Sequence, residues 1–309
     1  MEAKWSAMNA GWRLALYGAG LVAAFAASLG LAHIVVPDSV VAARTQEGNT
    51  MNDHTAAPES PTHQEHGTHP PQGLSVSRNG YVLTAVHVPN RVGQTGRLNF
   101  RILDPAGQPV TAYRRQHEKD LHLIVVRSDG ARFRHVHPSL DASTGSWSLP
   151  WTWQAAGVYR LYADFLPAGQ DDAMTLTRTI DVAGSYAPRK REPQKVVQVD
   201  GYTVTLSGDL AAGEMGDLTA SVSRDGEPVT TLQPYLGAFG HLVALRDGDL
   251  AYLHVHPEGD APAAGQSGGP DIGFMATAPS PGRYLLYLDF RVDGQVHTAE
   301  FVVDAERKH

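Results

Sequence analysis

Hydrophobic and polar residues alternate in short runs along most of the chain, and one long apolar run stands apart near the amino terminus. Gly, Pro, Asn and Asp separate the short runs, which is typical of β-strands joined by turns. No stretch outside the amino-terminal run shows helical periodicity. In the first half of the chain, the clearest predicted strands are residues 81–86, 96–103, 121–127, 132–137, 159–165 and 175–182.

The long apolar run covers residues 14–36 and contains no formal charge. A helix of this length spans a bilayer core of about 30 Å. Lys4 and Arg13 precede the run, so the positive-inside rule predicts that residues 1–13 stay cytoplasmic. The chain would then be a single-pass protein of the bacterial cytoplasmic membrane with extracytoplasmic domains. A cleaved signal peptide, cut near residues 41–43, is the alternative, and it exports the same domains.

Residues 37–73 form a predicted disordered linker, rich in Thr, Gln, Glu and Pro and nearly free of large apolar residues beyond position 45. It carries His54, His63, His66 and His69. Short histidine-rich tracts collect divalent metals without a preset geometry. The alternative is a polar tether that is rich in histidine for no functional reason.

The remaining sequence is one unit written twice. The histidines of the first unit (His122, His135, His137) recur 119 positions later (His241, His254, His256), and Pro follows the last histidine of each set. Residues 157–165 recur at 282–290, and the intervening drift falls in a loop, where insertions are tolerated. The expected domains are residues 74–184 and 196–305, joined by a linker at 185–195. Their size and strand content predict two all-β, antiparallel β-sandwiches, immunoglobulin-like or cupredoxin-like.

An Asp129-Gly130 pair between two predicted strands indicates a β-hairpin. A two-residue loop places His122 opposite His137, with His135 on the same face, because side chains alternate with period two. In the second unit, the Asp-Gly pair at 247–248 places His241 opposite His254 and keeps His256 on that face. Opposite side chains are close enough to share a metal ion. Each unit is therefore predicted to hold a three-histidine site.

Three imidazoles suit Cu(II) or Zn(II), and Cu(II) is favoured. The chain has no cysteine and only six methionines, which makes Cu(I) a less suitable cargo. His117 and Asp120 precede the first cluster and are weaker candidate ligands. Asp164 and Asp289 occupy equivalent positions in the two units, where each could add a ligand or orient an imidazole. No cofactor other than a metal ion is predicted.

The stretch from His117 through His122-Leu-Ile-Val-Val to His135-Val-His-Pro resembles sequences of poorly characterised bacterial envelope proteins. These proteins are loosely described as associated with heavy metals or copper tolerance. The resemblance is strongest over residues 117–138 and their copy. It implies extracytoplasmic metal handling, but no mechanism.

These features predict an extracytoplasmic, membrane-anchored protein for metal binding, buffering or hand-over, whose partners would be envelope metal-transport proteins. The alternative is a non-catalytic interaction or structural module of the envelope, in which the histidines only support the fold. A metalloenzyme is a third reading, but no Ser-His-Asp arrangement or phosphate loop is present, so no enzyme is predicted. A net charge of −7 argues against nucleic acid as a partner.

Overall fold

The computed structural model describes residues 72–253, 255–263 and 265–307. Over these residues the chain is all-β, as the sequence predicts, and contains no helix. None of the described residues forms a helix that could cross a bilayer. The predicted cytoplasmic segment 1–13, the predicted membrane helix 14–36 and nearly all of the linker 37–73 lie outside the described residues.

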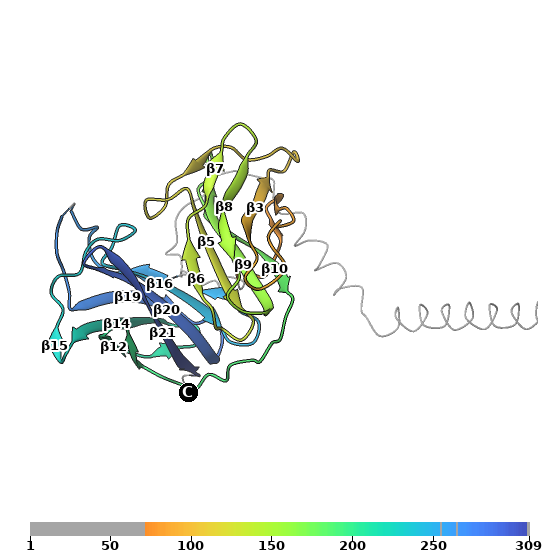
Figure 1. Cartoon of the computed structure of the whole chain (residues 1–309). Coiled ribbons are helices and arrows are strands. Elements are labelled where there is room, and N and C mark those ends of the chain that lie inside the picture. The colour runs from red at the N-terminus through yellow and green to blue at the C-terminus, as the bar shows by residue number, and fades with distance from the viewer. Residues whose placement is uncertain (1–71, 254, 264, 308–309) are drawn as a thin grey trace, which may run out of the picture. The chain divides into compact units, whose positions relative to one another are not determined.

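The first repeat is a pair of antiparallel sheets (Figure 1, orange to green). One sheet has the order β1-β2-β3-β8-β7, and the other has the order β10-β9-β5-β6, with β4 paired to β9. The strands are β1 (Ser77–Arg78), β2 (Tyr81–Leu83), β3 (Thr95–Leu103), β4 (Tyr113–Arg114), β5 (Leu121–Arg127), β6 (Arg134–Val136), β7 (Ser139–Asp141), β8 (Ser146–Thr152), β9 (Gly157–Pro167) and β10 (Met174–Val182).

The second repeat has the same plan (Figure 1, cyan to blue). Its sheets run β11-β12-β14-β19-β18, with β15 on β14, and β13-β21-β20-β16-β17. The strands are β11 (Val196–Val199), β12 (Tyr202–Ser207), β13 (Leu210–Ala211), β14 (Met215–Arg224), β15 (Glu227–Pro228), β16 (Gly240–Arg246), β17 (Tyr252–Leu253), β18 (Val255–Pro257), β19 (Asp271–Thr277), β20 (Gly282–Val292) and β21 (Gln295–Glu306).

Each repeat encloses its own hydrophobic core between its two sheets. In the first repeat, Phe100 and Trp147 from one sheet pack against Leu123 and Leu161 from the other. Phe274 and Phe301 are central in the second repeat. The alternation of apolar and polar residues along these strands buries one face of each sheet, which is the physical basis of a sandwich.

Strand β5 departs from simple alternation because all seven of its residues are buried. Leu121, Leu123 and Val125 face the core of the first repeat, whereas Ile124 and Val126 belong to a separate buried cluster. That cluster joins the two repeats and contains Ile124, Val126, Tyr162, Val243, Leu245, Leu250, Tyr252, Leu285, Tyr287 and Val302, with Phe133 packed against it. We call it the junction. A strand that is buried on both faces needs apolar residues at consecutive positions.

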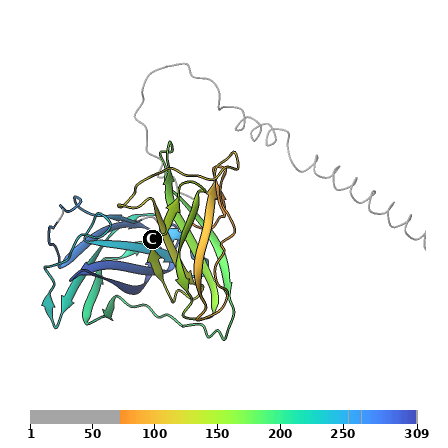
Figure 2. The same cartoon turned by 45° about the horizontal axis from the view of Figure 1, so that its top comes forward.

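The contacts across the junction are reciprocal. The Tyr162 hydroxyl donates to the carbonyl of Leu250 at 2.5 Å, and the Tyr287 hydroxyl donates to the carbonyl of Gly130 at 2.6 Å. Tyr162 and Tyr287 occupy the same position in the two repeats. Equivalent surfaces therefore meet in an arrangement like an isologous dimer interface within one chain. Figure 2 shows the β-strands of both repeats from a second direction.

Candidate metal centre

The hairpin of β5 and β6 has the predicted register. Ile124 is paired with His135, and Leu123 is paired with Val136. The loop is longer than the predicted two residues, because β5 ends at Arg127 and β6 begins at Arg134. His122 lies on the junction side of β5, in register with Ile124 and Val126. This register brings His122, His135 and His137 together, and we call them the histidine triad.

The predicted register of the second hairpin is wrong. Ala244 is paired with Leu253 and Leu245 with Tyr252, two residues away from the prediction, so His241 is not in register with position 254. The cause is the turn. The Leu250 amide donates to the carbonyl of Arg246, and the side chain of Asp249 accepts from the Ala251 amide. A four-residue turn replaces the expected Asp-Gly turn and shifts the pairing.

His256 does not share a sheet face with His241, contrary to the prediction. It lies on β18, which is paired with β19 in the opposite sheet, where His256 faces Met275. His254 lies outside the described residues. The expected three-histidine site of the second repeat therefore stays a prediction, whereas the neighbours of His241 are described below.

Three imidazole nitrogens of the triad converge on one point. His122 Nδ1 lies 2.9 Å from His135 Nε2 and 3.2 Å from His137 Nε2. The ligand atoms of all three residues lie within 4.8 Å of one another. With metal–nitrogen bonds of about 2.0 Å, ligands at right angles are about 2.8 Å apart and tetrahedral ligands about 3.3 Å apart. The two short nitrogen–nitrogen distances fall at or between these values.

Fixed partners determine which nitrogens face inward. His122 Nε2 lies 3.0 Å from the carbonyl oxygen of Gln116 and therefore donates to it. His135 Nδ1 lies 2.9 Å from Oδ2 of Asp289 and donates to this carboxylate. In the neutral rings, His122 Nδ1 and His135 Nε2 are then both lone-pair acceptors. Two acceptors 2.9 Å apart need either a proton or a metal ion between them.

Burial keeps two rings of the triad, those of His122 and His137, in the metal-ligating form. His122 is 3% exposed, and the pKa of its imidazole is lowered to about 3, mainly because burial disfavours the charged ring and secondly because His135 is close. The pKa of His137 is also lowered to about 3, for the same two reasons. Neutral imidazole is the form that ligates metals. The side chain of His135 is 1% exposed.

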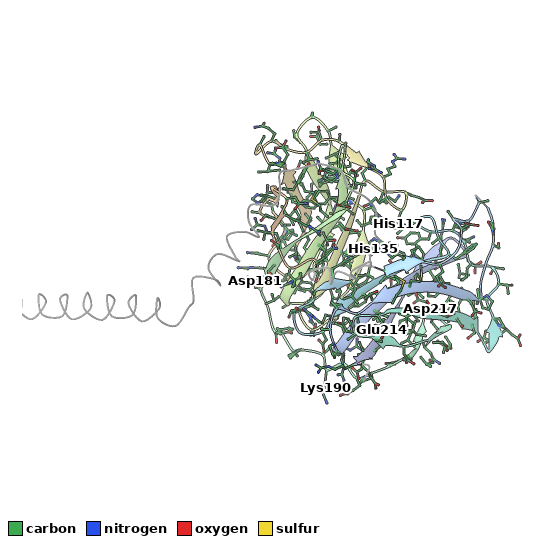
Figure 3. All side chains as sticks on the ribbon, turned by 180° about the vertical axis from the view of Figure 1, so that it is seen from behind. His117, His135, Asp181, Lys190, Glu214 and Asp217 are labelled. Carbon is green, nitrogen blue, oxygen red and sulfur yellow. The ribbon has the colours of Figure 1, made fainter. Side chains whose placement is uncertain are left out.

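Two further histidines contact the triad. His241, from the second repeat, stacks on His122 with ring centroids 5.4 Å apart and lies 4.8 Å from the ring of His135. Burial lowers the pKa of His241 well below its ordinary value. The exposed His117 lies 5.4 Å from His241 and 6.0 Å from His122. Figure 3 shows His117 and His135 beside each other.

The turn before β5 holds His117 in place. The backbone amides of Gln116 and Lys119 each donate a hydrogen bond to the carbonyl of the other residue. The two residues between them, His117 and Glu118, have φ angles of 46° and 67°. Two left-handed residues in a two-residue loop are typical of a type I′ turn. The turn also directs the Gln116 carbonyl toward His122.

The carboxylates considered as weaker candidates have different surroundings. Asp289 bonds His135 across the junction and also accepts a hydrogen bond from Thr298 at 2.6 Å. Asp164 is paired with His122 in the β5–β9 register and accepts from Thr175 at 2.9 Å. Burial raises the pKa of Asp164 to about 6. Asp120 lies 3.5 Å from Arg115 in a surface ion pair.

Sequence reasoning missed three parts of this centre: His241 joins the first repeat's cluster, Asp289 reaches across the junction, and the Gln116 carbonyl holds His122. A local pattern cannot show contacts between residues that lie 154 positions apart. One signal was available. The uninterrupted apolar run of β5, copied in β16, indicates strands buried on both faces and hence a partner surface for the histidine-bearing face.

The family described as "Domain of unknown function (DUF8832)" matches this chain twice, over residues 76–183 and 197–307. The chain belongs to this family. The two matches confirm the internal repeat, and they leave the predicted association with copper as a prediction. No match to a curated protein was found.

Solved structures give weak similarities to the two family domains. The Yersinia pseudotuberculosis adhesin InvE is 13% identical over 75% of this chain and 60% of that structure, with a TM-score of 0.22. The bacterial integrin-binding protein invasin is 11% identical over 74% of this chain and 39% of its own, with a TM-score of 0.21. The D0-D1 domain of intimin is 9% identical over 69% and 92%, with a TM-score of 0.19. At these TM-scores the similarities carry no argument about function.

Proposed function

We propose that this protein binds a divalent metal ion, Cu(II) or Zn(II), on the histidine triad, outside the cytoplasm. The observation that supports the proposal is the convergence of three imidazole nitrogens, one from each ring of the triad. In His122 and His135, the other ring nitrogen donates a hydrogen bond to a fixed acceptor. This is the arrangement of ligating histidines with their outer hydrogen-bond partners in metalloproteins.

The donor set favours Cu(II) over Zn(II). All three donors are imidazole nitrogens, and the affinity of nitrogen ligands for divalent ions is highest for Cu(II) in the general order of first-row metals. Zn(II) accepts the same ligands in tetrahedral geometry. The long apolar run at residues 14–36 supports anchoring in the cytoplasmic membrane, and the histidines of the linker would raise the local concentration of metal near the domains.

Calorimetric titration of the full chain with Cu(II) and with Zn(II) tests this function. The untagged protein carries His54→Gln, His63→Gln, His66→Gln and His69→Gln, so that linker histidines do not add to the stoichiometry. We expect one ion per chain, bound at micromolar affinity or tighter, and loss of binding in His137→Ala. His87→Ala, a histidine of the first repeat outside the triad, is the matched control and should bind normally. Absence of binding to the parent protein would refute the proposal, and two independent ions would favour one site in each repeat.

The second candidate is a non-catalytic envelope module whose histidines support the fold. The observation in its favour is the buried pair of His135 and Asp289, which ties the two repeats together whether or not a metal is bound. Here a proton occupies the space between His122 and His135. This role predicts that a chelator leaves the melting temperature unchanged and that His135→Ala lowers it equally with and without Zn(II), as differential scanning calorimetry would show.

A further inference from the structure

We propose that Asp289 of the second repeat is a positioning residue for the metal centre of the first repeat, so that metal binding and docking of the two repeats stabilise each other. This inference rests on the proposed metal-binding function. Of the two residues that accept hydrogen bonds from the triad's outer nitrogens, Gln116 and Asp289, one then comes from the second repeat, which contributes none of the three converging nitrogens.

Both oxygens of the Asp289 carboxylate are engaged. Oδ1 accepts from the Thr298 hydroxyl at 2.6 Å, and Oδ2 accepts from His135 Nδ1 at 2.9 Å. The side chain of Asp289 is 4% exposed and that of His135 is 1% exposed. Water therefore does not compete with the pair, and a hydrogen bond in such surroundings is electrostatically stronger than one at the surface. Strand pairing fixes the orientation, because Asp289 on β20 lies between His241 on β16 and Thr298 on β21.

The equivalent carboxylate of the first repeat is Asp164. Asp164 has the same strand position and the same threonine contact, through Thr175. Within the described part of the chain, no histidine nitrogen lies within hydrogen-bonding distance of Asp164. His254, the counterpart of His135 in the second repeat, lies outside the described residues. The carboxylate that holds a ring of the triad in a chosen tautomer is Asp289, through Nδ1 of His135.

The consequence for metal binding follows from the tautomer. A carboxylate on Nδ1–H keeps Nε2 of His135 free for the metal and makes that nitrogen more basic. Loss of such an outer partner weakens metal affinity by about 10-fold to 100-fold. Asp289 and His135 belong to different repeats, so metal binding is coupled to docking of the repeats. This coupling is reciprocal. If docking orients His135 and strengthens metal binding, then a bound metal ion must stabilise the docked arrangement to the same extent.

The experiment compares three substitutions in the full chain with the four linker histidines replaced by Gln. Asp289→Ala removes both accepting oxygens, and Asp289→Asn keeps the volume and one acceptor but removes the charge. Asp200→Asn is the matched control, because Asp200 holds His297 Nδ1 at 2.8 Å in a histidine–carboxylate pair whose ring contacts are Tyr202 and Phe290. Each protein is titrated with Cu(II), and the electron paramagnetic resonance spectrum of the loaded form is recorded.

We expect Asp289→Ala to bind one Cu(II) about 10-fold to 100-fold more weakly than the parent, with an altered spectrum. The affinity of Asp289→Asn should fall between those of Asp289→Ala and the parent. Asp200→Asn should match the parent in both affinity and spectrum. Zn(II) should raise the melting temperature of the parent more than that of Asp289→Asn. Equal affinities and spectra for the parent and Asp289→Asn would overturn the positioning role while leaving metal binding intact. A parent protein that binds no metal would instead refute the proposed function. If Asp289→Ala does not fold, Asp289→Asn alone decides the question.

Discussion

A reciprocal pair of tyrosine hydrogen bonds connects the two repeats, and both bonds can be removed without disturbing the packing. Tyr162 and Tyr287 are both fully buried, and their hydroxyls donate to carbonyls of the opposite repeat. Burial raises the pKa of each phenol, so both hydroxyls remain protonated donors at any working pH. The double substitution Tyr162→Phe with Tyr287→Phe deletes two oxygen atoms and leaves the rings in place.

The expected loss comes from the carbonyls that remain. Without the hydroxyls, the carbonyls of Leu250 and Gly130 lose buried donors, and each unsatisfied group costs about 1–3 kcal/mol. The double variant should therefore lose about 2–6 kcal/mol, provided that the two sites act independently. This is a large fraction of the roughly 5–15 kcal/mol by which an ordinary domain is stable. Stacking of Phe133 on the ring of Tyr287, with centroids 4.0 Å apart, should survive the change.

Tryptophan positions allow the coupling to be measured. Trp147, Trp151 and Trp153 all lie in the first repeat, and the other two tryptophans, Trp5 and Trp12, precede residue 72. With those two replaced by Phe, fluorescence follows the first repeat alone, whereas far-ultraviolet circular dichroism follows both repeats. In urea, the two signals of the parent should change together, because the docked repeats unfold as one unit. In the double variant, the midpoints of the unfolding transitions seen by fluorescence and by circular dichroism should differ.

Tyr159→Phe is the control for a lost tyrosine hydrogen bond. Its hydroxyl donates to the carbonyl of Ala155 at 2.8 Å, within the first repeat. This variant should lose stability while its two signals still coincide. The reasoning is refuted if the double variant unfolds within about 0.5 kcal/mol of the parent, with coincident transitions. The hydrogen bonds across the junction would then not couple the repeats.

Three further outcomes are expected. Burial lowers the pKa of His122 and of His137 to about 3 in the fold, against about 6.5 in the unfolded chain. The unfolded chain therefore binds more protons than the fold between about pH 6.5 and pH 3, so the free energy of unfolding should fall on acidification. Between pH 7 and pH 5 we expect a loss of about 2 kcal/mol from the buried His122 and a smaller loss from the half-buried His137, measured by urea titration. Asp129→Ala removes the carboxylate that pairs with the buried guanidinium of Arg127 and should lower the free energy of unfolding by about 3–5 kcal/mol. Asp249 makes the equivalent pair with Arg246, but its side chain is 41% exposed, so Asp249→Ala should cost clearly less in the same assay. Zn(II) at about 100 times its dissociation constant should stabilise the protein by about 2.7 kcal/mol, and a chelator should reverse this in calorimetry.

Much of each sandwich follows from local pattern. The predicted strands at residues 121–127 and 175–182 match β5 and β10 to within one residue, because alternation and turn residues define strands locally. The register of the first hairpin was also predictable, and with it the shared neighbourhood of His122 and His135. The second hairpin was not. The side chain of Asp249 and the backbone of Leu250 build a longer turn than the Asp-Gly signal indicates.

The sequence by itself determined that the chain carries two copies of one β-sandwich and that each copy places histidines beside a hairpin. This information is local, since side-chain periodicity and turn chemistry act over a few residues. The tertiary structure decided that the outer faces of the two copies meet, that His241 joins the first repeat's cluster and that Asp289 engages His135. Docking of two preformed surfaces depends on their shape and polarity over many residues at once, and no short stretch of sequence records which surfaces will meet.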